Sequence, residues 1–187
     1  MIVFLTVEEH ISRNNKIEYS LSRIAAGERA ALGELYELVK TDVYAYALST
    51  LKNREDTEDV MHDTFVRIYR YASRYEPKGS PMAWIITIAM NLAKRHRHLK
   101  LRHVSLDDSI ATADQISAPI DENVAKSDFI KRILQCLGDI ERKIVVLHAV
   151  SGFKHREIAS MLGISLGTVL SKYNRAIKKL REFAEEE

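Results

Sequence analysis

Apolar residues recur at spacings of three and four along most of this chain, and this periodicity restricts its fold more than any other feature. Such spacing places apolar side chains on one face of an α-helix, whereas a half-buried strand needs strict alternation. Only three Pro and seven Gly interrupt the 187 residues, so a helix has few places where it must stop. The pattern predicts an all-α protein.

The N-terminal half carries four apolar stripes, and each predicts its own helix. The stripes span residues 32–39, 43–51, 60–72 and 84–92. Ser80 is a suitable N-cap and Pro81 a suitable first residue for the last of these helices. Trp84 lies among apolar neighbours in the same helix, so we expect it in the core. Four helices of this kind suffice to bury one compact bundle.

The helical periodicity disappears between Val104 and about Asn123, where Ser, Asp, Ala and a Pro accumulate as they do in linkers. It returns from Phe129 onward. We therefore expect two small helical domains joined by a flexible linker. The predicted boundaries give an N-terminal extension at 1–18, a first domain at 19–103, the linker at 104–123 and a second domain at 124–187.

The net charge of +2 hides a segregation of charges along the chain. Five basic residues and no acid lie between Lys94 and Arg102, and a second acid-free basic block runs from Leu166 to Arg181. Between them, residues 107–128 are acidic. Two basic blocks separated in this way indicate two sites for a polyanion, although solvated helix faces are the commoner origin of charge runs.

Cysteine usage and hydropathy indicate the compartment. Cys136 is the single cysteine, so it has no disulfide partner within the chain, which fits a reducing environment. The apolar opening at residues 2–5 is too short for a signal sequence, and no later apolar run reaches membrane-spanning length. We expect a cytoplasmic protein with no membrane insertion.

The strongest local motif, at residues 155–169, is typical of a helix-turn-helix. Ile158 and Leu162 share one face of its first helix, and Gly163 supplies a turn that needs positive φ. Ser165 then caps a second helix. The inward side of this second helix is predicted to carry Val169, Tyr173, Ala176 and Leu180.

The outward side of the second helix offers hydroxyl, amide and guanidinium groups without an acid. This chemistry suits a DNA major groove, where Arg pairs with guanine and Asn with adenine. The predicted DNA contacts are Ser165, Thr168, Leu170, Ser171, Lys172, Asn174, Arg175 and Lys178. We expect Arg175 and Ser171 to read bases, and Lys178 and Lys179 to contact phosphates. An ordinary helical hairpin is the alternative, and the basic, acid-free helix favours DNA binding.

Both halves of the chain resemble extracytoplasmic-function sigma factors. The string from Glu157 through Val169 to Arg181 resembles region four of that family. Residues 58–67, which follow Leu35-Tyr36, resemble the region-two helix that binds the polymerase clamp, and residues 83–93 resemble the promoter-melting helix. The resemblance covers about residues 19–183 in the right order, which makes it far more specific than either motif alone.

The resemblance implies a non-enzymatic protein with no catalytic residue, cofactor or metal. Region two of such a protein docks on the β′ clamp helices of core RNA polymerase and captures the non-template strand of the minus-ten element. Region four binds the duplex minus-thirty-five element and the β flap. The resemblance also implies an anti-sigma factor as a partner.

Residue by residue, the resemblance agrees with the helical patterns. The predicted polymerase contacts are Asp59, His62, Asp63 and Val66. The predicted minus-ten contacts are Lys78, Gly79, Asn91, Lys94, Arg95 and His98. The first three polymerase contacts lie on the side of their helix away from the Val60 stripe, and the last four minus-ten contacts share one helix face suited to a phosphate backbone. The loop at residues 76–80 matches the place where the family holds an extruded base.

The chain departs from the common pattern of the family at several positions. Met90 replaces a common Arg, His62 a common Gln, and Leu170 a common basic residue, so the promoter preference is open.

Two rival functions share some of these sequence features. A helix-turn-helix regulator that is not a sigma factor would share the C-terminal chemistry but not residues 58–91. A metalloenzyme that uses Asp59, His62 and Asp63, or His96, His98 and His103, is not expected. His-x-His spacing does not put both rings on one helix face, and no matching Cys or carboxylate set lies nearby in the sequence.

Overall fold

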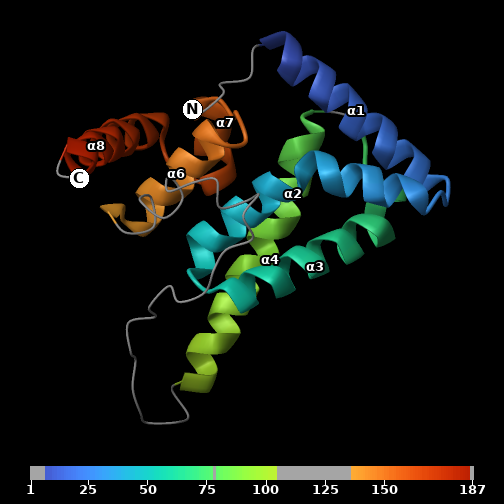
Figure 1. Ribbon diagram of the computed structural model, residues 1–187, viewed down its shortest axis with the longest axis horizontal. Helices are drawn as coiled ribbons and strands as arrows, with labels where there is room; N and C mark the ends of the chain where they lie inside the picture. The colour runs from blue at the N-terminus through green and yellow to red at the C-terminus, as the bar shows by residue number, and fades with distance from the viewer. Residues whose placement is uncertain (1–6, 78, 105–135, 186–187) are drawn as a thin grey trace. The chain divides into compact units, whose positions relative to one another are not determined.

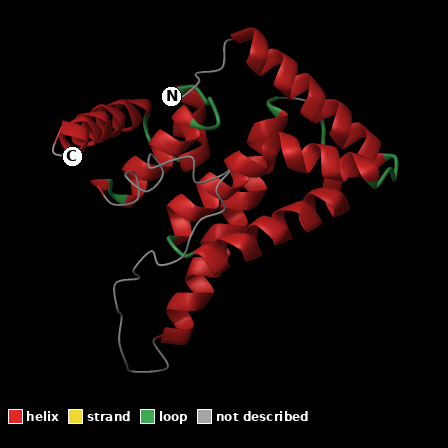
Figure 2. Ribbon diagram, in the orientation of Figure 1, coloured by secondary structure: helices red, strands yellow, loops and turns green. Residues whose placement is uncertain are grey.

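The computed structural model describes residues 7–77, 79–104 and 136–185, with side chains over 11–77, 79–100, 136–183 and 185. Every regular element in these ranges is a helix, which confirms the all-α prediction, and short loops join the helices (Figure 2). The helices divide into two compact units (Figure 1). Residues 105–135 lie outside the described ranges, so the linker at 104–123 and the boundaries beside it stay predictions.

The first unit contains α1 (Val7–Ala25), α2 (Ala30–Leu51), α3 (Arg54–Tyr71), the short 3-10 helix η1 (Ala72–Arg74) and α4 (Pro81–Val104). Helices α2, α3 and α4 pack against one another, and α1 lies along α2 and contacts η1 and α4. Helix α4 begins at Pro81, as its sequence predicts.

Helix α2 corrects the prediction of two helices at 32–39 and 43–51. A single helix of 22 residues carries both stripes, because no Gly or Pro interrupts residues 40–42. Residues 42–50 are buried on all sides of the helix, which blurs the one-sided periodicity expected for a surface helix. The charged residue in this stretch, Asp42, is 1% exposed and is paired with Arg13 of α1. The same guanidinium donates to the carbonyl oxygen of Leu38 at 2.6 Å.

Helix α1 is an integral part of the first unit. Its residues Ile17, Leu21 and Ile24 are at most 3% exposed and belong to the core. The boundary predicted between residues 18 and 19 therefore falls inside one continuous helix. The turn from α1 to α2 uses Gly27 at φ +92°, a conformation that favours glycine.

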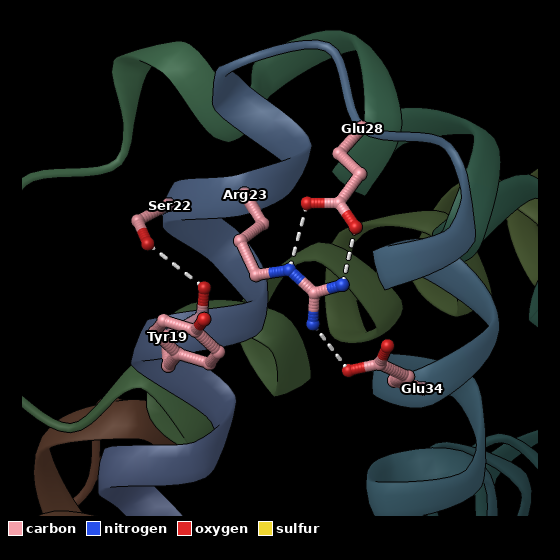
Figure 3. Close-up of polar contacts among 5 residues, drawn as sticks. All are labelled: Tyr19, Ser22, Arg23, Glu28 and Glu34. Atoms are coloured by element: carbon pink, nitrogen blue, oxygen red, sulfur yellow. Dashed lines mark hydrogen bonds and ion pairs between the residues drawn. The ribbon is translucent and has the colours of Figure 1, made fainter.

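An ion-pair cluster closes the corner between α1 and α2 (Figure 3). The Nε of Arg23 donates to Oε2 of Glu28 at 2.8 Å, and its Nη1 donates to Oε2 of Glu34 at 2.5 Å. The hydrogen bond from Arg23 lowers the pKa of the Glu28 carboxyl below its ordinary value. One guanidinium thus joins the end of α1, the turn and the start of α2.

The second unit contains α6 (Asp139–Ala149), α7 (His155–Leu162) and α8 (Leu166–Glu185). Gly163 adopts φ +65°, which confirms the predicted turn between α7 and α8. The N–H of Thr168 donates to Oγ of Ser165 at 3.1 Å, so Ser165 caps α8 as predicted. Val169 and Ala176 are fully buried against the other two helices.

Candidate polymerase and nucleic-acid interfaces

The predicted polymerase contacts occupy the exposed side of α3. Asp59, His62 and Asp63 are exposed and Val66 is half-buried. On the opposite side of the helix, Val60, Thr64 and Ile68 are buried in the core, and their exposed fractions do not exceed 2%. The predicted sidedness of α3 is therefore confirmed, and the binding role of the exposed side stays a prediction.

The predicted minus-ten contacts on α4 form one exposed face. Asn91, Lys94, Arg95 and His98 are all exposed. Thr87, four residues before Asn91, is also exposed and extends this face by one turn toward the preceding loop. Sequence reasoning missed Thr87, although its position at i−4 from Asn91 was a usable signal.

The basic block of α4 is divided between two sides of the helix. Nζ of Lys100 lies 2.8 Å from Oδ2 of Asp56, and Nε2 of His96 lies 3.9 Å from its Oδ1. Asp56 belongs to the first turn of α3, where Asn53 caps the helix. These two side chains of α4 therefore face α3, whereas Lys94, Arg95 and His98 remain available to a polyanion.

The loop between η1 and α4 is held at both of its ends. Lys78 lies outside the described residues, and Gly79 is exposed. Ser80 caps α4 through a 3.4 Å contact from the N–H of Ala83 to its Oγ. Trp84, which the sequence places in the core, is only partly buried, and its ring centroid lies 5.3 Å from that of Tyr75.

The predicted minus-thirty-five contacts on α8 lie outside the packed side of the helix. Six of them are exposed and two are half-buried. The exposed residues are Ser165, Leu170, Ser171, Asn174, Arg175 and Lys178, and the half-buried ones are Thr168 and Lys172. The hydroxyls of Ser165 and Thr168 are 2.8 Å apart and so bond to each other at the helix start. Asn174 and Arg175, adjacent in the sequence, are both exposed.

Lys179 has a different environment from its neighbour on α8. Its Nζ lies 2.7 Å from Oε2 of Glu141, whose side chain is 5% exposed. Burial raises the pKa of the Glu141 carboxyl, but hydrogen bonds from Lys179 and from the N–H of Gly138, together with the charges of Lys179 and Lys172, outweigh burial, and the pKa lies below its ordinary value. Lys179, expected to contact phosphates, therefore pairs α8 with α6.

Two histidines and a tyrosine join the three helices of the second unit. The rings of His148 and His155 stack with centroids 4.3 Å apart, and Tyr173 meets both rings edge-on. Nδ1 of His148 donates to the carbonyl oxygen of Phe153 at 2.8 Å. Nε2 of His155 is buried without a hydrogen-bond partner in the described part of the chain. Burial, and then the neighbouring His148, lower the pKa of His155 below its ordinary value.

Neither a metal centre nor a membrane span is found in the described ranges. No three His, Cys, Asp or Glu side chains there lie close enough together to hold an ion, and the side chain of His103 is outside these ranges. Among the helices as described, none combines the length and the apolar character that crossing a bilayer requires.

The chain matches two protein families in the predicted order. The family model of sigma-70 region 2 matches residues 35–100, and the model of sigma-70 region 4 matches residues 130–180. Both matches fall inside the two predicted domains. The RNA polymerase sigma factor CarQ of Myxococcus xanthus is 30% identical over 165 residues, which cover 87% of this chain and 94% of CarQ.

Further relatives and solved structures agree with these matches. The ECF RNA polymerase sigma factor SigK of Mycobacterium ulcerans is 26% identical over 90% of this chain and 94% of its own. The sigma factor RpoE of Bartonella quintana, solved with the anti-sigma factor NepR, aligns with a TM-score of 0.64 at 25% identity, over 82% of this chain and 96% of its own. CnrH, solved with the cytosolic domain of CnrY, aligns with a TM-score of 0.61 at 22% identity, over 92% and 99%.

This chain belongs to the sigma-70 family of RNA polymerase sigma factors, within its extracytoplasmic-function group. It is a transcription initiation factor.

Proposed function

We propose that this protein binds core RNA polymerase and directs it to promoters through three separate helix faces. The exposed acidic side of α3 binds the polymerase clamp, α4 and the loop before it hold the minus-ten element, and α8 reads the minus-thirty-five element. The observation that carries the proposal is the charge of these faces. Asp59 and Asp63 are exposed on α3, whereas the exposed faces of α4 and α8 carry the cations.

The face of α4 suits a single strand. Lys94 and Arg95 can follow the phosphates of an extended strand, and Asn91 offers an amide to a base edge. The loop at residues 76–80 would receive one unstacked base next to this face. Strand capture of this kind needs binding alone, so we also propose that the protein has no enzymatic activity and needs no cofactor.

The face of α8 suits a duplex. The helix is packed through Val169 and Ala176, so its opposite side can enter a major groove without unfolding the unit. Arg175 and Asn174 carry the bidentate groups that distinguish base pairs, and Leu170, 42% exposed, can contact a thymine methyl group.

An anti-sigma protein is the proposed regulator. RpoE of Bartonella quintana was solved in complex with the anti-sigma factor NepR, and its fold and sequence resemble this chain. We propose an equivalent protein partner here, and we place the protein in the cytoplasm because its target polymerase works there.

One experiment separates the proposal from its rivals. Purified core RNA polymerase is titrated with this protein, and the complex is then offered promoter DNA. A sigma factor forms a stoichiometric complex that starts promoter-specific transcripts. A helix-turn-helix regulator binds DNA but needs another sigma factor for transcription, and an enzyme does neither. Failure to bind core polymerase would overturn the proposal.

A further inference from the structure

Glu18 and Tyr75 join α1 to the start of the loop before α4. The hydroxyl of Tyr75 donates to Oε1 of Glu18 at 3.1 Å, although the two residues are 57 positions apart. Tyr75 is the residue at which η1 ends and the loop begins, and its N–H donates to the carbonyl oxygen of Ala72 at 3.0 Å. Helix α1 therefore fixes the position of the chain as it enters the loop.

Tyr75 also connects the two ends of that loop. Its ring lies against the ring of Trp84 in the first turns of α4, with centroids 5.3 Å apart and planes at 56°. Tilted aromatic pairs at this separation are favourable beyond the area they bury. The backbone N–H of Trp84 donates to the carbonyl oxygen of Ser80, the residue at which the loop ends, at 3.3 Å, as part of the start of α4. The Tyr75 ring thus lies between the residue at which the loop begins and the first turn of α4, which follows the loop.

The hydrogen bond is of a kind that can hold a side chain in place. Burial, followed by the contact with Glu18, raises the pKa of Tyr75 to about 12, so its hydroxyl stays a donor at neutral pH. Without the hydrogen bond from its hydroxyl to Glu18, the Tyr75 side chain keeps its ring contact with Trp84.

We propose that Glu18 and Tyr75 are positioning residues for strand capture, and that α1 acts through them to hold the ends of the loop that receives an unstacked promoter base. This inference rests on the proposed function of the loop. Neither residue needs to touch DNA, because each acts through the placement of the loop and of Trp84.

The test uses the full chain assembled with core RNA polymerase. The probe is a single-stranded oligonucleotide with the non-template minus-ten sequence that this holoenzyme selects from a random library. Tyr75→Phe removes the hydroxyl and keeps the ring, and Glu18→Ala removes the acceptor. Each should weaken probe binding about 3- to 10-fold, the range for the loss of one such hydrogen bond. The double variant should bind no more weakly than either single variant, because both remove the same bond.

Two variants serve as controls. Glu18→Gln keeps an oxygen acceptor for the tyrosine hydroxyl and should bind the probe within about twofold of the parent protein. Tyr19→Phe removes a hydroxyl from the neighbouring residue of α1, which is 65% exposed, and should change nothing. Affinity for core polymerase should be the same for all of these proteins.

A base-specific measurement distinguishes positioning from general damage to the fold. Each minus-ten base of the probe is replaced in turn by an abasic site, and the captured position is the one that lowers binding most. On the probe abasic at that position, Tyr75→Phe and the parent protein should bind equally. Equal loss on the intact and abasic probes would mean a merely structural role and would overturn the inference.

The inference and the proposed function fail in different ways. If the parent holoenzyme does not select or bind any minus-ten strand, the proposed function of the loop is wrong. If the parent binds and Tyr75→Phe binds equally well on the intact probe, the loop captures the strand without help from α1. Only the positioning role would then be lost.

Discussion

Nζ of Lys179 lies 2.7 Å from Oε2 of Glu141, and this ion pair ties α8 to the first turn of α6. Its sequence neighbour Lys178 is exposed and paired with Glu182 of the same helix at 3.6 Å. Two adjacent lysines of the basic block therefore have different surroundings. One supports the second unit, and the other is accessible to phosphates.

The first prediction concerns this difference. Lys179→Ala leaves the buried carboxylate of Glu141 with the hydrogen bond from the N–H of Gly138 but without the lysine charge, so it should lower the free energy of opening of the second unit by about 1–2 kcal/mol. Amide hydrogen exchange in α6 and α8 measures this opening. The matched control, Lys178→Ala, removes an exposed pair and should change it by less than about 0.5 kcal/mol. Equal exchange in the two variants would contradict the structural role of Lys179.

The ion pair between Lys179 and Glu141 should also make the stability of the second unit depend on pH. The pKa of Glu141 is lower in the folded protein than its ordinary value of 4.5, so its contribution to stability is present above that pH. The contribution is lost as the pH falls below 4.5 and the carboxylate is protonated. The difference between Lys179→Ala and the parent protein should therefore shrink under strongly acidic conditions. If the difference in stability between the two proteins stayed the same from pH 7 to pH 3, the Glu141 carboxylate would not be its source.

A second prediction concerns the exposed acids of α3. Replacing Asp59 and Asp63 together by Lys should weaken binding to core polymerase, because it reverses the charge of the exposed side and leaves the Val60 side packed. Helical content measured by circular dichroism should not change. Glu37→Lys, an exposed charge reversal on α2, is the control and should bind as the parent does. If the double replacement leaves the affinity for core polymerase unchanged, the polymerase does not bind this side of α3.

A third prediction separates base reading from phosphate contact on α8. Arg175→Ala should cost about 1–3 kcal/mol of binding and relax the preference at one base position, as the loss of a bidentate contact does. Lys178→Ala should weaken binding to all sequences alike and reduce the salt slope by about one. Titration against single-base promoter variants over a range of salt measures both. If Arg175→Ala weakens every variant equally, base reading belongs to Ser171, Asn174 or Leu170.

A fourth prediction concerns the stacked histidines of the second unit. The pKa of His155 lies below its ordinary value of 6.5 in the folded protein, so the unfolded chain takes up its proton first as the pH falls. The stability of the second unit should be full above pH 6.5 and decrease as the pH falls below it. His155→Phe keeps a ring beside Tyr173 and should remove much of this decrease. Amide exchange at pH 7.5 and 5.5 measures it, with His98→Gln, an exposed position, as the control.

Much of the fold could be predicted from the sequence, because the deciding signals are local. The stripe of Val60, Thr64 and Ile68 is buried as expected, and Gly163 has the positive φ that its turn requires. These features depend on residues within one or two turns of each other, where helical geometry fixes the sides. The exposed faces of α3, α4 and α8 follow from the same geometry.

The contacts that escaped prediction join residues far apart in the sequence. Arg13 pairs with Asp42 across 29 positions, and that pair allows an acid to lie in the buried half of α2, where the sequence suggests a break. Lys179 and Glu141 are 38 positions apart, so a basic run cannot reveal which lysine is already paired. Periodicity shows which side of a helix is buried, but it does not show which side chain lies opposite.

The most direct test of the account is transcription by purified core RNA polymerase with this protein on a library of random promoters, with the transcript starts sequenced. We predict starts at a fixed distance downstream of two shared sequence elements, and none from core polymerase alone. Charge reversal at Asp59 and Asp63 should abolish the starts, and Arg175→Ala should relax the upstream element alone. Starts that share no upstream or downstream element, or that are the same without the protein, would contradict the account.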